Sequence, residues 1–101
     1  MLDDRNRGYN DVYRETTMKV TLFRTYLGLV LRTLRREQGL TLRDVAARAS
    51  VSYGYLSEVE RGRKEISSEM LGSICDALNM PLWEVLDRTA RSIALPDRPP
   101  A

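Results

Sequence analysis

Polar and charged side chains of several kinds gather in the stretch SYGYLSEVERGRK, residues 52–64. If this stretch is helical, successive residues turn by about 100°, so Leu56 and Val59 point to one side. The opposite arc holds Tyr53, Gly54, Ser57, Glu58 and Arg61, with Tyr55 and Glu60 on its two rims. Hydroxyl, carboxylate and guanidinium groups donate or accept hydrogen bonds, and the guanidinium is also positively charged. The stretch therefore suits recognition of a polar or charged partner.

The residue types that catalysis needs are scarce in this chain. It has no histidine, which is the usual general base and the commonest metal ligand, and its single cysteine is Cys75. It also has no glycine-rich loop of the kind that cradles phosphates. We therefore expect no enzyme activity, no cofactor and no metal site. Cys75 falls in an apolar helical stripe, which favours an inert position in the core.

Size and charge distribution narrow the class of protein. A length of 101 residues indicates one domain with a modest core. Residues 22–66 hold nine basic and five acidic side chains, whereas residues 67–101 hold three basic and five acidic ones. A basic central part followed by an acidic C-terminal third is typical of small nucleic-acid-binding domains, although charged surfaces are common. No apolar run reaches the roughly 20 residues of a membrane span, and a single cysteine favours a cytoplasmic protein.

Residues 22–38 form the first helix that the apolar spacing predicts. Its main stripe consists of Leu27, Val30, Leu31 and Leu34. Further apolar side chains widen that stripe, namely Leu22, Phe23, Tyr26 and Leu29. A helix that is apolar around much of its circumference is usually buried on two sides. We therefore expect a contact with a second subunit through Leu22, Tyr26 and Leu29.

Two short helices are predicted after Gly39. Thr41 caps the first, which reaches about Ala49, and Asp44 completes a capping box. Ser52 caps the second, which Gly62 ends. The turn ASVS joins them, and this pattern is typical of a helix-turn-helix. On spacing alone, a structural helix pair in a bundle remains an alternative.

The remaining sequence predicts two further helices. Ser67 or Ser68 caps the fourth, and its apolar face consists of Leu71, Ile74, Cys75 and Leu78. Pro81 opens the fifth, at the position that tolerates proline best. The residues of the fifth helix expected to face the core are Leu82, Val85 and Leu86. Trp83 faces away from them.

We expect three parts along the chain. Residues 1–21 are polar and should form a partly flexible arm, or one that packs on its own domain or on a partner. Residues 22–91 should form a compact, all-α domain of five helices. Residues 92–101 include the stretch LPDRPP and should form a disordered tail.

Residues 27–86 resemble the Cro/phage-repressor-like (XRE) helix-turn-helix domains. The matching stretches are LRTLRREQGLTLRDVA, the VS before the third helix, ERG, and ICDALNMPLWEVL. A narrower resemblance, carried by GYLSEVERG, is to the actinobacterial regulators of Clp protease genes (the ClgR type). The wider family implies a lambda-repressor-like fold that binds double-stranded DNA, commonly as a homodimer. The narrower one implies activation of protease and stress genes, with RNA polymerase as a further candidate partner.

The resemblance and the helical angle together suggest roles for residues around the third helix. The resemblance implies a structural ion pair between Glu60 and Arg35 of the first helix. In the major groove, base-reading contacts are expected from Tyr53, Gly54, Tyr55, Ser57 and Glu58, with Gly54 allowing close backbone approach. Phosphate contacts are expected at helix N-termini and from nearby cations, namely Thr41, Arg43, Ser52, Arg61, Arg63 and Lys64.

Several residues keep a second interpretation. Glu58 either accepts a hydrogen bond from cytosine N4 or is a solvated or arginine-paired acid. Tyr55 either contacts DNA or packs within the domain. Trp83 either joins Leu22, Tyr26 and Leu29 in the dimer contact or packs on the arm. For the whole chain, a phage-type repressor and an antitoxin-like module remain alternatives to an activator of Clp protease genes.

Overall fold

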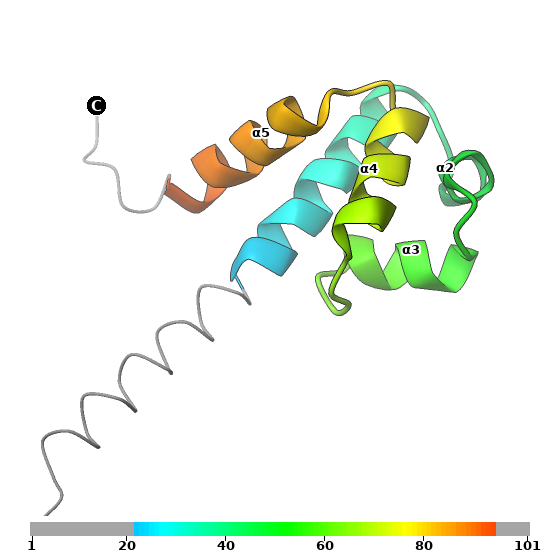
Figure 1. Cartoon of the computed structure of the whole chain (residues 1–101), viewed down its shortest axis with the longest axis horizontal. Helices are drawn as coiled ribbons and strands as arrows, with labels where there is room; N and C mark the ends of the chain where they lie inside the picture. The colour runs from blue at the N-terminus through cyan, green and yellow to red at the C-terminus, as the bar shows by residue number, and fades with distance from the viewer. Residues whose placement is uncertain (1–21, 95–101) are drawn as a thin grey trace, which may run out of the picture.

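The computed structural model describes residues 22–94, which form five helices without a strand among them (Figure 1). Residues 22–37 are helical, and they are followed by α2 (Leu42–Ala49), α3 (Tyr53–Glu60), α4 (Ser68–Ala77) and α5 (Leu82–Ala94). The predicted all-α fold of five helices is confirmed. None of these helices combines the length and the apolar character needed to cross a bilayer. The arm predicted for residues 1–21 lies outside the described residues.

Three helices begin at side chains that the sequence predicts as caps. Thr41 Oγ1 accepts a hydrogen bond from the Asp44 N–H, and the Asp44 carboxylate accepts one from the Thr41 N–H. This is a reciprocal capping box. Ser52 and Ser67 cap α3 and α4, each through a hydroxyl oxygen that accepts from a backbone N–H three residues on. These caps satisfy N–H groups that have no helical partner, so the start of each helix is fixed locally.

The turn between α2 and α3 passes through a residue in the left-handed region. Ser50 has φ 58° and ψ 41°. This conformation favours glycine, so a serine is strained there. The turn is closed by the Val51 N–H, which donates to the Ala46 carbonyl at 3.0 Å. Backbone hydrogen bonds to the last turn of α2 therefore help to hold the turn in a conformation that the serine does not itself prefer.

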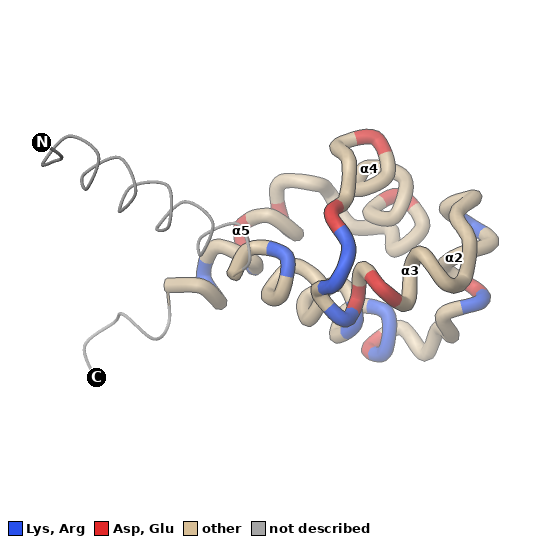
Figure 2. The backbone as a smooth tube through the Cα atoms, turned by 90° about the horizontal axis from the view of Figure 1, so that it is seen from below, with Lys and Arg blue, Asp and Glu red and all other residues tan. Residues whose placement is uncertain are grey.

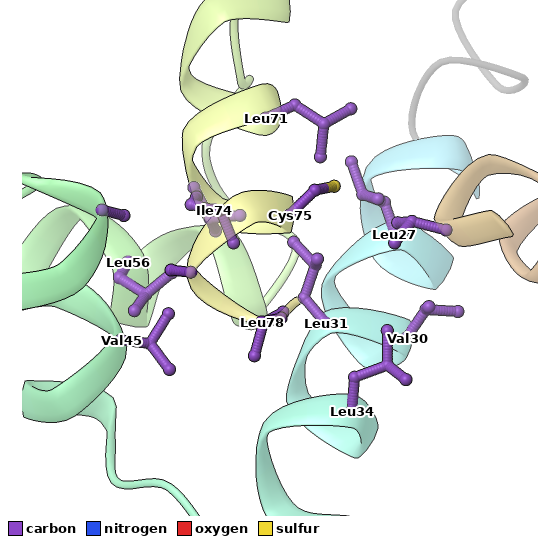
Figure 3. Close-up of a cluster of buried hydrophobic side chains, with 14 of the residues drawn as sticks. Leu27, Val30, Leu31, Leu34, Val45, Leu56, Leu71, Ile74, Cys75 and Leu78 are labelled. Atoms are coloured by element: carbon purple, nitrogen blue, oxygen red, sulfur yellow. The ribbon is translucent and has the colours of Figure 1, made fainter. Parts of the chain in front are cut away.

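The hydrophobic core lies around α4, with the 22–37 helix on one side and α2 and α3 on the other (Figures 1 and 3). Cys75 of α4 points toward Leu27, and Ile74 lies toward Leu56 of α3 (Figure 3). All four side chains are fully buried. Burying a large aliphatic side chain stabilises a fold by about 1.5–3 kcal/mol. The inner side of α3 is thus fixed to the core, which leaves its other side free to face outward.

Two glycines set how closely the 22–37 helix approaches the end of α3. A Cβ at Gly28 would lie 2.5 Å from the carbonyl oxygen of Val59 and 2.6 Å from that of Glu60. A Cβ at Gly62, whose φ is +74°, would lie 2.9 Å from the Cα of Thr25. Backbone atoms cannot move aside as a flexible side chain can. Glycine is therefore required at both positions, and neither contact was predictable from the sequence.

The inner face of α5 differs from the prediction. Val85 is fully buried, as expected, but Leu82 and Leu86 are 42% and 38% exposed. Their predicted orientation toward the core was wrong, because α5 is buried only along a narrow line through Val85 and Thr89. The buried Thr89 hydroxyl donates to the Val85 carbonyl at 2.8 Å, so its burial leaves no unsatisfied donor. Pro81 precedes α5, and its carbonyl accepts from the Glu84 and Val85 N–H groups.

The domain also extends further than predicted. Residues 92–94 were assigned to the tail, but α5 continues through them to Ala94. Two surface ion pairs four residues apart support this helix, Arg88–Glu84 at 3.0 Å and Arg91–Asp87 at 2.9 Å. Such pairs contribute about 0.3–0.5 kcal/mol each, so they add modestly to the stability of α5. Residues 95–101 lie outside the described residues.

Candidate nucleic-acid interface

The residues predicted from the helical angle to face outward lie on the side of α3 opposite the core. Leu56 and Val59 are buried on the inner side. The outer residues are Tyr53, Gly54, Ser57, Glu58 and Arg61, of which Ser57 and Glu58 are half-buried and the others exposed. These side chains and the bare backbone at Gly54 therefore share one face of α3 and its C-cap.

Gly54 has no packing role inside the domain. A Cβ at this position would have no heavy atom within 4 Å. Glycine in a helix costs about 0.5–1 kcal/mol relative to alanine. Unlike Gly28 and Gly62, Gly54 is therefore not required by its own fold, and it leaves a stretch of bare backbone on the outer face of α3.

Glu58 has a cationic neighbour in the free protein. Its Oε1 lies 3.9 Å from Arg61 Nη1, three residues further along the chain. The Glu58 side chain is 37% exposed and that of Arg61 58% exposed. Because an exposed pair at this distance contributes little to stability, the carboxylate can exchange its partner at small cost.

Glu60 turns inward and forms an ion pair with Arg35. Arg35 Nε donates to Glu60 Oε2 at 2.8 Å, and Nη2 donates to Oε1 at 3.0 Å. Arg35 Nη1 also donates to the Leu40 carbonyl at 2.9 Å. Both charged residues are buried, and the hydrogen bonds to Glu60 are the main cause that raises the pKa of Arg35. The second acid of α3 thus joins two helices and is not available to a ligand.

Tyr55 is placed differently from the other residues expected to read bases. Its ring packs against the core, and its hydroxyl donates to the Glu65 carbonyl at 3.3 Å. Burial raises the pKa of the phenol. Of the two interpretations left open by the sequence, this placement matches packing within the domain. The hydroxyl also connects α3 to the loop that follows it.

Cations lie beyond both ends of α3. Arg43 of α2 is near the N-terminal end, whereas Arg63 and Lys64 are in the loop between α3 and α4 (Figure 2). All three are exposed. Thr41 and Ser52 are exposed at the N-termini of α2 and α3, where N–H groups and the helix dipole favour anions. The outer face of α3 is thus framed by groups that suit a polyanion.

Arg43 lies over the aromatic ring of Tyr53. Its guanidinium carbon is 5.5 Å from the ring centroid, which is within the range of a cation–π contact. The contact joins α2 to the first residue of α3 across the turn. From the sequence, Arg43 is expected to touch phosphate and Tyr53 to touch bases, each independently of the other. Their contact was missed because a spacing of ten residues across a turn has no periodic signature.

An apolar groove lies between the 22–37 helix and α5. Its lining residues are Tyr26, Leu29, Val30, Thr33, Arg88, Arg91 and Ser92. Two of the predicted dimer residues, Tyr26 and Leu29, are therefore brought together here. Leu22 and Trp83 are exposed, at 42% and 67%, but they do not line the groove. The four residues thus expose apolar surface on one pair of helices without forming a single pocket.

Residues 22–94 contain no group of three or more histidine, cysteine or acidic side chains that could hold a metal ion. Cys75 is free and buried in the core. Burial raises the pKa of its thiol to about 11, so the reactive thiolate is disfavoured at neutral pH.

Comparisons with known proteins agree with this geometry. Residues 26–88 match the model of a family described as a helix-turn-helix domain. The transcriptional regulator ClgR of Mycobacterium tuberculosis is 54% identical over 84 residues, which cover 79% of this chain and 75% of that protein.

Solved structures are similar as well. The clp gene regulator ClgR from Corynebacterium glutamicum superposes with a TM-score of 0.71 at 51% identity, covering 74% of this chain and 80% of that one. The restriction-modification controller protein C.AhdI from Aeromonas hydrophila gives a TM-score of 0.60 at 28% identity, covering 60% and 92%. The match over residues 26–88 and the likeness to the mycobacterial regulator show that this chain belongs to the helix-turn-helix family of DNA-binding transcriptional regulators that includes ClgR.

Proposed function

We propose that this chain regulates transcription by laying α3 in the major groove of specific operator DNA. The major groove is about 12 Å wide and admits one helix, and only there is each base pair distinguishable. The main support for this proposal is the environment of Gly54. This glycine is exposed on the outer face of α3, and no neighbour inside the domain requires a glycine there. A bare backbone at that position allows close approach to DNA.

Base recognition is assigned to four residues of α3, namely Tyr53, Gly54, Ser57 and Glu58. The Glu58 carboxylate would accept a hydrogen bond from cytosine N4 after leaving Arg61. Tyr53 would contact a thymine methyl or a phosphate at the start of the helix. We leave Tyr55 out of this set because its hydroxyl is bonded to the Glu65 carbonyl.

Phosphate contacts would position the domain on the duplex. We assign them to the cations and helix N-termini around α3, namely Thr41, Arg43, Ser52, Arg61, Arg63 and Lys64. Exposed cations at both ends of α3 support this assignment. Arg61 then has two possible partners, since release from Glu58 would free its guanidinium for a phosphate.

We further propose that the chain acts as a homodimer through the exposed apolar residues of the 22–37 helix and α5. Tyr26 and Leu29 in the groove, together with the exposed Leu22 and Trp83 of the same two helices, offer apolar surface that a second copy would cover. A two-fold dimer would hold two α3 helices about one DNA turn, roughly 34 Å, apart. Each α3 would read one half of a palindromic operator.

The likeness to ClgR of Corynebacterium glutamicum, a clp gene regulator, suggests which genes this chain regulates. We propose that this chain activates Clp protease and stress genes in the cytoplasm, in contact with RNA polymerase, and that it has no enzyme activity. Groups for catalysis do not converge on the outer face of α3, which supports a role in binding.

Footprinting on genomic fragments, with the mass of the free protein measured in solution, tests the proposal. We expect protection of two half-sites one turn apart upstream of Clp genes, and a mass of two chains. In vitro transcription from the protected promoter should rise when the protein is added. Protection spread evenly over all fragments would contradict sequence-specific binding, and a fall in transcription would identify a repressor.

A further inference from the structure

The contact between Arg43 and Tyr53 connects a residue expected to touch phosphate with one expected to touch bases. Arg43 is in the first turn of α2, and Tyr53 is the first residue of α3. Both side chains are exposed, yet the guanidinium carbon lies 5.5 Å from the ring centroid. Among residues 22–94, no carboxylate forms an ion pair with Arg43. The Tyr53 ring is therefore the interaction partner that the described residues offer this guanidinium.

We propose that Arg43 is a positioning residue for Tyr53, so that base discrimination at this end of α3 depends on the pair. The inference rests on the proposed binding of α3 in the major groove. An exposed tyrosine in free rotation loses rotamer freedom when DNA immobilises it, and that loss weakens binding. A guanidinium stacked on the ring limits this freedom before DNA arrives.

The stack also leaves Arg43 able to meet DNA. A planar guanidinium contacts a ring through its face, while its five N–H donors lie in its plane. Those donors remain free for a phosphate oxygen. Lysine offers the same charge as a compact ammonium, without the flat face. Substitution by lysine therefore separates positioning from plain charge attraction.

The test measures the affinity of five proteins for two duplexes by fluorescence anisotropy at several salt concentrations. The proteins are the wild type, Arg43→Lys, Tyr53→Leu, the double variant and the control Arg48→Lys. The duplexes are the footprinted operator and one of equal length and composition with a scrambled sequence. We expect Arg43→Lys to lower the ratio of operator to scrambled affinity by about two- to fivefold, the size of an exposed cation–π contact. Affinity for the scrambled duplex and its salt dependence should stay unchanged.

The double variant tests whether the residues act as a pair. In the Tyr53→Leu background, Arg43→Lys should have no further effect on the ratio, because the ring is already gone. Arg48→Lys, at another exposed arginine of α2, is the matched control and should leave the ratio unchanged. Equal losses on both duplexes, or losses that multiply in the double variant, would overturn the inference. A wild type that does not prefer the operator would overturn the proposed function and the inference with it.

Discussion

Gly28 of the 22–37 helix lies directly against the backbone of Val59 in α3, where a Cβ would stand 2.5 Å from the carbonyl oxygen. Replacing Gly28 by alanine should therefore force the two helices apart. Overpacking of this kind costs about 1–3 kcal/mol, more than the 0.5–1 kcal/mol that alanine adds to a helix. Urea denaturation should show a lower free energy of unfolding.

Gly72 in α4 supplies the control for this substitution. A Cβ there would have no heavy atom within 4 Å, so Gly72→Ala should raise stability slightly. If Gly28→Ala and Gly72→Ala were equally stabilising, the close approach of the first helix to α3 would be contradicted.

The ion pair between Arg35 and Glu60 should be costly to break from one side. In Glu60→Gln the buried guanidinium loses its countercharge, and disruption of a buried pair costs up to about 3–5 kcal/mol. Thermal unfolding should show a clear drop in melting temperature. Replacing both partners by apolar residues of similar size, as in Arg35→Met with Glu60→Leu, should recover part of the loss. Glu60→Gln with unchanged melting and lost DNA binding would instead make Glu60 a ligand contact.

Asp44 should contribute to stability in a pH-dependent way. The hydrogen bond from the Thr41 N–H is the largest cause that lowers its pKa below the usual 3.8. Because the folded-state pKa is the lower one, the contribution is present above about pH 4 and is lost as the pH falls through that pKa. Asp44→Asn should therefore lose less stability than the wild type between about pH 5 and pH 2. Two parallel curves of unfolding free energy against pH would contradict this.

Lys64 should contribute affinity without sequence preference. It is exposed in the loop after α3, and a phosphate contact releases one counterion. Lys64→Gln should weaken binding to operator and scrambled duplexes alike, and should reduce the slope of log affinity against log salt by about one. Lys64→Arg keeps the charge and should keep the slope. A loss confined to the operator would show that Lys64 reads sequence.

Features fixed within one or two turns of chain were predictable from the sequence. The caps at Thr41, Ser52 and Ser67 depend on hydrogen bonds to residues three positions on, so residue types alone indicate them. The ion pair between Arg35 and Glu60 spans 25 residues and was expected only because the chain resembles a known family.

Features that depend on how helices pack were not predictable. The need for glycine at Gly28 arises from a backbone far along the chain, which no local pattern records. The apolar spacing of α5 indicated which side of the helix faces the core, but not how much of that side is buried. Leu82 and Leu86 were therefore wrongly placed in the core. The position of Tyr55 on the rim of α3 was compatible with two partners, and only the fold brings Glu65 to its hydroxyl.

Gly54→Ala tests most directly whether the outer face of α3 meets DNA. A Cβ at Gly54 meets nothing within the domain, so the variant should melt at or above the temperature of the wild type, as should Gly72→Ala. Operator affinity measured on these two folded variants is the decisive comparison. We predict that Gly54→Ala loses operator affinity while Gly72→Ala keeps it. Equal, undiminished affinity in both variants would contradict a close approach of α3 to DNA.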